Sequence, residues 1–152
     1  MQPQIHIRRA TLGDVPAIRD CVARAYEHYI ERIGGPPGPM LDDYARVVNE
    51  REAYVAEFNA IIVGVLVLGE SDEGFLLDNI AVRPEQRRQG LGRRLLELAE
   101  TRAAMAGYDS IYLYTHQKMA ENRALYERIG YIQYDERTEH GATRVFMRKR
   151  LR

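Results

Sequence analysis

The sequence predicts an α/β (α+β) fold in which a mixed, mostly antiparallel sheet packs against helices. Three strand-like runs follow one another with short connections, at residues 53–58, 60–68 and 75–82. Connections this short join antiparallel strands. The third run leads into a basic turn with two glycines, a helix from Leu91 to about Ala106, and a strand at 110–116. Because a strand, a helix and a strand in series form a parallel crossover, we expect a mixed sheet.

The composition is typical of a soluble globular protein. Its 152 residues are enough for one domain with a buried core, which we expect to span 1–152. Lys+Arg and Asp+Glu both number 22, so the net charge gives no general argument for binding nucleic acid or a membrane. The chain has a single cysteine, Cys21, no apolar run near the ~18 residues of a membrane span, and no signal-peptide pattern at its start. These features predict a cytoplasmic protein.

The N-terminal third predicts a short strand followed by two helices. Residues 4–9 alternate polar and apolar, and Thr11 followed by Asp14 is typical of a capping box that opens a helix. A run of glycines and prolines at 34–39 cannot form regular structure, and a second helix follows at 40–50. The segment between the helices is either the wall of a substrate site or a rigid surface connection.

The strand at 75–82 contains an irregularity. Two polar residues, Asp78 and Asn79, interrupt an otherwise apolar run. They indicate either an exposed edge or a bulge that redirects side chains and frees backbone groups.

The C-terminal residues predict one more helix and a hairpin. The helix runs from 120 to 129 and is closed by Gly130. Two strands, at residues 131–135 and 143–150, then pair as a hairpin across the connection at 139–142.

The turn at Arg87–Arg94 is the most distinctive stretch of the sequence, because four arginines flank Gly90 and Gly92. The first N–H groups of a helix have no intrahelical partner and can bind an anion, and glycine lets the backbone approach that anion closely. The turn lacks the Gly-Lys-Ser/Thr ending of a P-loop and the third glycine of a dinucleotide fingerprint. It therefore predicts a phosphate site of another kind.

Several motifs resemble the GCN5-related N-acetyltransferase (GNAT) family. Arg87–Gly92 matches that family's acetyl-CoA signature, Arg/Gln-x-x-Gly-x-Gly/Ala, and 79–85 is similar to its fourth strand and the exit from it. Asn122–Tyr131 resembles a later motif of the family, and Ile7–Thr11 looks like its opening. The resemblance covers the whole chain. It implies the order β-α-α-β-β-β-α-β-α-β-β, with the sheet splayed between the fourth and fifth strands.

The resemblance also implies an activity. The protein is expected to be an acyltransferase that moves the acetyl group of acetyl-CoA, its co-substrate, to a primary amine of a small molecule or peptide, without a metal. The N–H groups of the turn would hold the pyrophosphate, and the strand before it would pair with the pantetheine arm. The expected cofactor-binding residues are Ile80, Ala81, Val82, Arg87, Arg88, Gln89, Gly90, Leu91, Gly92, Arg93, Asn122 and Tyr126.

Two residues are the candidates for catalysis. By resemblance, Tyr126 would donate a proton to the leaving thiolate, although a core tyrosine is the other interpretation. Asp78 would accept the proton of the amine. Other candidates for the base are Glu31, His28 and His116, or water alone. Asn122 is assigned to the cofactor, with capping of its helix as the alternative.

The acceptor is the least determined part of the prediction. By resemblance, its groove would involve Tyr29, Glu31 and Asp43, and these acids, together with Glu136 and Glu139, would favour a cationic amine. Two other functions stay open: an acyl-CoA-binding sensor without transfer, and acetylation of a macromolecule, with nucleic acid an unlikely partner. Pairing of the terminal strands of two copies would give a homodimer, which the sequence does not decide.

Overall fold

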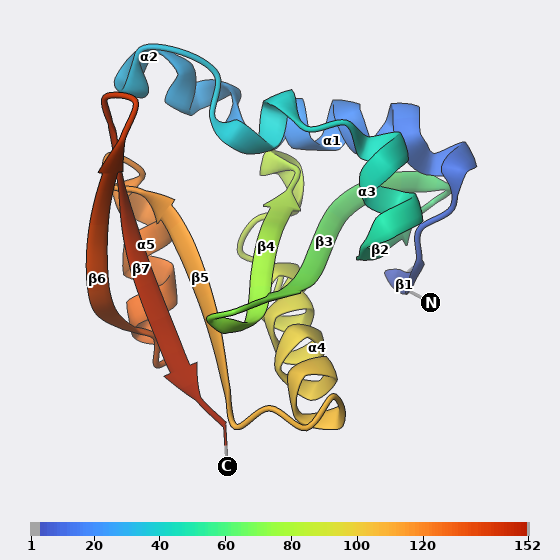
Figure 1. Ribbon diagram of the computed structural model, residues 1–152. Helices are drawn as coiled ribbons and strands as arrows, with labels where there is room; N and C mark the ends of the chain where they lie inside the picture. The colour runs from blue at the N-terminus through green and yellow to red at the C-terminus, as the bar shows by residue number, and fades with distance from the viewer. Residues whose placement is uncertain (1–3, 152) are drawn as a thin grey trace.

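The computed structural model describes residues 4–151 and contains a seven-stranded sheet in the order β1-β2-β3-β4-β5-β7-β6 (Figure 1). Neighbouring strands are antiparallel except for the parallel pair β4–β5. This arrangement confirms the predicted mixed, mostly antiparallel fold. The strands are β1 (His6–Arg9), β2 (Glu52–Phe58), β3 (Ile61–Ser71), β4 (Gly74–Val82), β5 (Ser110–His116), β6 (Ile132–Glu139) and β7 (Ala142–Arg150).

Helices cover both faces of the sheet (Figure 1). Side chains of a strand point alternately to the two faces, so Val55 and Val65 pack against the layer of α1 and α3, whereas Ala56 and Leu66 pack against that of α4 and α5. A short helix, α2, follows α1. The helices are α1 (Val15–Tyr26), α2 (Ile30–Ile33), α3 (Tyr44–Glu50), α4 (Leu91–Met105) and α5 (Ala120–Arg128).

The predicted boundaries are close to the observed ones, apart from the ends of two strands and the start of the second helix, which was expected at residue 40 and begins at Tyr44 after a 3-10 turn at Gly38–Leu41. The β2–β3 hairpin turns at Asn59 and Ala60, whose positive φ angles of 51° and 65° are those of a two-residue hairpin turn. Strand β3 continues to Ser71, and β6 continues to Glu139, beyond the expected ends at 68 and 135. Both extensions consist of polar residues at the rim of the sheet, where the apolar pattern gives no signal.

Strand β4 contains a bulge at Asp78. Leu77 pairs with Leu68 and Asn79 with Val67, so Asp78 is the additional residue. Because an extra residue shifts the alternation of side chains, Leu77 packs in the α4 layer, whereas Asn79 faces α1 and α3. The sequence left open whether Asp78 and Asn79 mark an exposed edge or a bulge, and the bulge is confirmed.

Strands β4 and β5 separate soon after they meet. Their pairing is confined to Phe75 with Ile111 and Leu76 with Tyr112. Beyond Leu76 the two strands diverge, which confirms the expected splay between the fourth and fifth strands.

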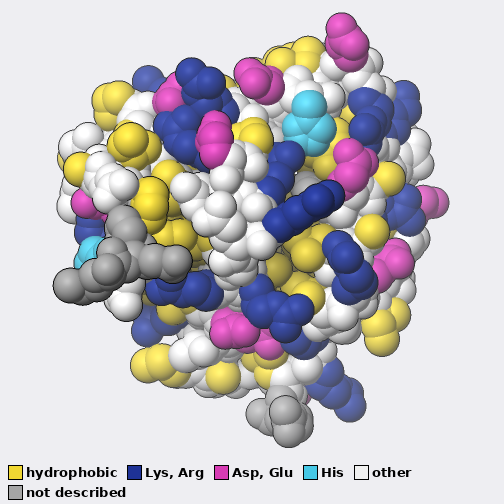
Figure 2. Space-filling view, turned by 180° about the vertical axis from the view of Figure 1, so that it is seen from behind, with side chains coloured by type: hydrophobic (Ala, Val, Ile, Leu, Met, Phe, Trp, Pro, Cys, Tyr) yellow, Lys and Arg dark blue, Asp and Glu magenta, His cyan; other side chains and the backbone are white. Residues whose placement is uncertain are grey.

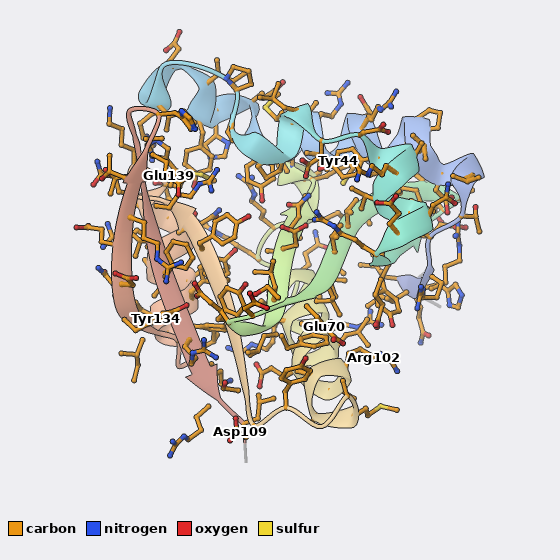
Figure 3. The ribbon with its side chains drawn as sticks, in the orientation of Figure 1. Tyr44, Glu70, Arg102, Asp109, Tyr134 and Glu139 are labelled. Carbon is orange, nitrogen blue, oxygen red and sulfur yellow. The ribbon has the colours of Figure 1, made fainter. Side chains whose placement is uncertain are left out.

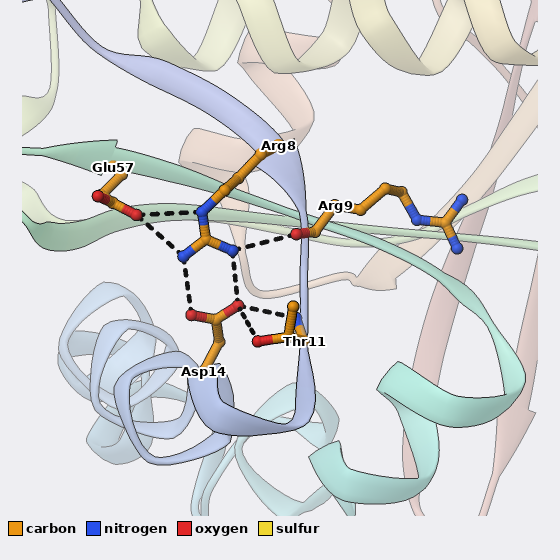
Figure 4. Close-up of polar contacts among 5 residues, drawn as sticks. All are labelled: Arg8, Arg9, Thr11, Asp14 and Glu57. Atoms are coloured by element: carbon orange, nitrogen blue, oxygen red, sulfur yellow. Dashed lines mark hydrogen bonds and ion pairs between the residues drawn. The ribbon is translucent and has the colours of Figure 1, made fainter.

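An ion cluster around Arg8 attaches β1 to the start of α1 (Figure 4). The Arg8 guanidinium donates to both carboxylate oxygens of Asp14, at 2.8 and 2.9 Å, and to Glu57 on β2. The Thr11 N–H donates to the same Asp14 carboxylate at 2.8 Å, as the predicted capping box requires. This cluster lowers the pKa of Asp14 to about 2, first through the hydrogen bond from Arg8.

We predict that Asp14→Asn removes part of the acid sensitivity of the fold. A carboxylate whose folded-state pKa lies below its unfolded value stabilises the protein above the unfolded value, and the stabilisation disappears as the pH falls toward the folded value. With values of 3.8 and about 2, the loss falls between those two pH values. Because Arg8 is partly exposed, we expect the change in the free energy of unfolding to be on the order of 1–2 kcal/mol.

Denaturant unfolding of the parent and of Asp14→Asn between pH 5 and pH 2 measures this effect. Asp109→Asn, at a carboxylate that forms no ion pair among residues 4–151, is the control. The same fall in unfolding free energy in the parent and in Asp14→Asn would contradict the prediction.

Candidate active site

Two cavities meet where β4 and β5 diverge. The first, of about 410 Å³, lies beside the loop 34–39, and we call it the loop cavity. The second, of about 500 Å³, lies beside the turn 87–93, and we call it the turn cavity. Both are within the size range of small-molecule sites. The residues that line both cavities are Tyr26, Ile80, Asn122 and Tyr126.

The turn cavity is bounded by the basic turn and the start of α4. Gly90 precedes the helix with φ of 83°, and Arg88 has φ of 66°, so the backbone of the turn curls back on itself. The first helical bond of α4 is from the Arg94 N–H to the Gly90 carbonyl, at 3.1 Å. Among residues 4–151, no acceptor is found for the N–H groups of 88–93. A row of free N–H donors at a helix N-terminus is suited to an anion.

Arginine side chains surround this row of N–H groups. Arg88, Arg93 and Arg128 line the cavity, and Arg87 donates to the Ala25 carbonyl at 2.9 Å, which holds the turn against the end of α1. The face on which α4 and α5 lie carries many Lys and Arg side chains around a hollow with apolar groups (Figure 2). Burial and the charge of Arg87 lower the pKa of His28, a further lining residue.

A buried chain of hydrogen bonds connects the bulge to the helices above it. Asn79, only 4% exposed, donates from Nδ2 to the Tyr44 hydroxyl at 2.9 Å, and Tyr44 donates to the Pro39 carbonyl. The Tyr26 hydroxyl is 3.0 Å from Asn79 Oδ1 and 2.7 Å from the Ile80 carbonyl. Tyr44 lies where the helical layer meets β4 (Figure 3). The chain therefore ties the wall of the loop cavity to the backbone at the junction of the two cavities.

Tyr126 lies at that junction on α5. It is 5% exposed, and its ring packs edge-on against Tyr131 with 5.8 Å between centroids. Within the described part of the chain, its hydroxyl has no hydrogen-bonding partner. Burial raises the pKa of Tyr126 well above its usual range, so the phenol keeps its proton and can act as a donor.

The loop cavity has charged groups on opposite walls. Asp78 forms an ion pair with Arg51, and only 10% of its side chain is exposed. Burial raises the pKa of Asp42. Arg144 on β7 lies over the ring of Tyr114, 5.1 Å from its centroid. Burial and the charges of Lys118 and Arg144 lower the pKa of His116.

Most of the residues assigned to the cofactor surround the turn cavity, but two do not. The Leu91 side chain is buried against β3, where a Cβ at Gly64 would lie 3.1 Å from its Cδ2. The Gln89 amide donates to the Glu85 carbonyl at 3.4 Å. Met119, not Asn122, precedes α5, so the capping alternative for Asn122 is wrong. The residues that line the cavity are Ile80, Ala81, Val82, Arg87, Arg88, Gly90, Gly92, Arg93, Asn122 and Tyr126.

The residues assigned to the acceptor are not brought together. Tyr29 is buried and lines the turn cavity, so it lies on the other side of the junction. Asp43 caps α3 by accepting from the Arg46 N–H at 3.3 Å. Glu31 is exposed, and it lines neither of the two cavities.

Other residues take the place of these three in the loop cavity. Asp42 and Arg51 flank α3, and Arg144 comes from the last strand. Sequence reasoning missed them because an isolated charged residue carries no pattern. The glycine–proline run was a usable signal, since residues 34–39 do line the loop cavity.

Neither a metal site nor a membrane-spanning helix is found among residues 4–151. No three or more His, Cys, Asp or Glu side chains are grouped to hold an ion in this part of the chain. Likewise, none of its helices is long and apolar enough to cross a bilayer.

Comparisons with known proteins agree with the geometry. The Escherichia coli K12 protein YjgM, described as an uncharacterized N-acetyltransferase, is 27% identical over an alignment of 138 residues that covers 85% of this chain and 83% of that protein. The ribosomal-protein-S18-alanine N-acetyltransferase of Escherichia coli superposes with a TM-score of 0.77 at 22% identity, over 97% of this chain and 94% of that chain. PaiA N-acetyltransferase from Thermoplasma acidophilum, solved with coenzyme A, superposes with a TM-score of 0.78 at 18% identity. The superposition covers 97% of this chain and 99% of that chain.

The family itself is shown by the sequence model of the acetyltransferase (GNAT) domain, which matches residues 49–133. This match spans β2 to the start of β6, and so includes the bulge, the basic turn and Tyr126. The chain therefore belongs to the GNAT acetyltransferase family, and it is an acyltransferase as its motifs predicted.

Proposed function

We propose that this protein transfers the acetyl group of acetyl-CoA directly to a primary amine of a small molecule or peptide. The observation that carries the proposal is the meeting of the two cavities at Tyr126. The turn cavity is lined by free N–H donors and arginines, and the loop cavity offers a separate space for a second reactant. Two substrates can thus approach one reaction point from opposite sides.

The turn cavity fits the donor substrate. Acetyl-CoA supplies an acetyl group activated as a thioester, attached through a long arm to a pyrophosphate. The N–H groups of 88–93 and the nearby arginines are suited to that pyrophosphate. Beyond Leu76, β4 presents an edge that β5 does not pair with, and this edge can bind an extended arm as an added strand. The likeness to PaiA, which was solved with coenzyme A, supports this assignment.

Residues at the junction then provide the chemistry. We assign to a backbone N–H of β4, near Ile80, the polarisation of the thioester carbonyl. The Tyr26 hydroxyl, 2.7 Å from the Ile80 carbonyl, fixes the orientation of that peptide group. Attack by the neutral amine forms the amide bond and breaks the carbon–sulfur bond. Tyr126 then donates the proton that the departing sulfur needs.

Asp78 is our proposal for the group that accepts the proton of the amine. It lines the loop cavity next to the junction residue Ile80, and the bulge places it there. The alternatives are less well placed. Nδ1 of His116 already accepts from the Lys118 N–H at 3.1 Å, and His28 lines the turn cavity rather than the loop cavity.

Release of CoA in the presence of a broad panel of amines tests the proposed function. We expect a thiol signal that requires both acetyl-CoA and an amine. Tight binding of acetyl-CoA without release on any amine would instead support an acyl-CoA sensor.

Tyr126→Phe is predicted to lower kcat by about 100-fold, because the departing thiolate loses its proton donor. The dissociation constant of acetyl-CoA should change little, since the ring remains in place. Steady-state kinetics and calorimetry on the same preparation separate the two quantities.

Tyr131→Phe is the matched control for this substitution. The Tyr131 hydroxyl is buried, has no partner among the described residues, and lines neither cavity. Its removal should leave kcat unchanged. Equal kcat values for Tyr126→Phe and the parent would exclude Tyr126 as the proton donor.

Gly90→Ala is predicted to weaken CoA binding by about 10-fold, through loss of charge-assisted hydrogen bonds from the turn. The reason is backbone strain: a Cβ at φ of 83° costs about 1–2 kcal/mol, although no atom lies within 4 Å of it.

Gly107→Ala separates the loss of binding from the loss of stability. Gly107 has φ of 92° just after the other end of α4, and its Cβ would also meet open space. We expect both variants to melt at a lower temperature, and only Gly90→Ala to raise the Kd for CoA in calorimetry. A parental Kd for Gly90→Ala would contradict the role of the turn.

A further inference from the structure

We infer that the acceptor carries a carboxylate beside its amine, as an amino acid does, and that Arg144 binds this carboxylate in the loop cavity. The inference rests on the proposed function, because it assigns the loop cavity to the acceptor. It narrows the amine to one chemical class.

Of the arginines that line the loop cavity, one forms no ion pair with the protein among residues 4–151. Two arginines and two aspartates line it. Arg51 is paired with Asp78, and Asp42 forms no ion pair with either arginine among the described residues. Arg144 has no carboxylate within ion-pair distance among residues 4–151. A guanidinium in a cavity wall with no protein counter-ion is a site for an anionic group of the substrate.

The sheet register and one aromatic contact place Arg144 at this wall, where its side chain is exposed. It lies on β7 between His116 of β5 and Arg137 of β6 in the sheet register. Arg137 forms ion pairs with Glu73 and Asp135. Of the two neighbouring arginines, only Arg144 is therefore free to bind an anion of the substrate. Arg144 instead packs over the Tyr114 ring, 5.1 Å from its centroid. A cation held over an aromatic face keeps its N–H groups free for a ligand.

His116 adds a second donor to the same wall. Its Nδ1 accepts from the Lys118 N–H at 3.1 Å, so in the neutral ring the proton is on Nε2. Burial and two nearby cations keep the ring neutral by lowering its pKa. An Nε2–H group beside a guanidinium is a combination that suits a carboxylate.

The acids that would favour a cationic acceptor do not line this cavity. Asp43 is committed to capping α3, and Glu31 lines neither cavity. Glu136 and Glu139 lie on β6, outside the lining of the loop cavity. The volume of about 410 Å³ is sufficient for an amino-acid-sized molecule.

Matched pairs of acceptors test the inference. Each standard L-amino acid is compared with its own L-amino amide in the CoA-release assay, and rates are expressed per concentration of neutral amine. The parent should prefer the acid of the best pair by about 10- to 100-fold in kcat/KM. In Arg144→Ala the ratio of kcat/KM for the acid to kcat/KM for the amide should fall toward one. In Arg144→Lys part of the preference for the acid should remain.

Arg150→Ala is the matched control. Arg150 lies on the same strand, is exposed and lines neither cavity, so its removal should keep the preference of the parent. An equal or greater rate with the amides in the parent, or an unchanged preference in Arg144→Ala, would overturn the inference while leaving the acetyltransferase function intact.

A binding measurement keeps the inference testable if no amine is acetylated, an outcome that would contradict the proposed function itself. Saturation-transfer NMR on CoA-loaded protein compares N-acetyl amino acids with N-acetyl amino amides. We expect signals from the acids in the parent and their loss in Arg144→Ala. Equal signals from acids and amides would overturn the carboxylate site.

Discussion

The bulge at Asp78 is the constraint on which the rest of the site depends. One additional residue in β4 exchanges the two faces of the strand from that point onward. Leu77 faces α4 before the bulge, whereas Asn79, two residues later, faces α1 and α3. The exchange gives a buried asparagine one hydrogen-bonding partner for its amide oxygen, Tyr26, and one for its amide nitrogen, Tyr44, where an unsatisfied amide would be costly.

The two cavities meet where this strand also separates from β5. Beyond Leu76, β5 no longer pairs with β4, so the strand that carries the bulge also has a free edge. The chain of hydrogen bonds from Pro39 through Tyr44 and Asn79 holds the loop wall on one side. On the other side, the basic turn begins α4 with its N–H groups unused. The proposed reaction uses both sides, with Tyr126 between them.

The sequence was informative where residues close along the chain act together. Periodic apolar residues predicted the strands and helices, because burial on one face imposes that period. The basic turn was recognisable because its glycines, arginines and helix start are consecutive. Of the residues that the family resemblance assigned to the cofactor, only Gln89 and Leu91 do not line the turn cavity. Tyr126 was found by resemblance, and whether it donates a proton is still a prediction.

The wall of the loop cavity, which we propose receives the acceptor, could not be predicted in the same way. Asp42, Arg51, His116 and Arg144 come from separate segments, and only the folded sheet brings them to one cavity. Their spacing along the chain carries no information, so Glu31 and Asp43 were equally reasonable choices. The amino-acid order thus specified the family, the fold and the basic turn, which are local or periodic features. The charges in the loop cavity were decided by packing between distant strands, because ion pairing determines which arginine remains free.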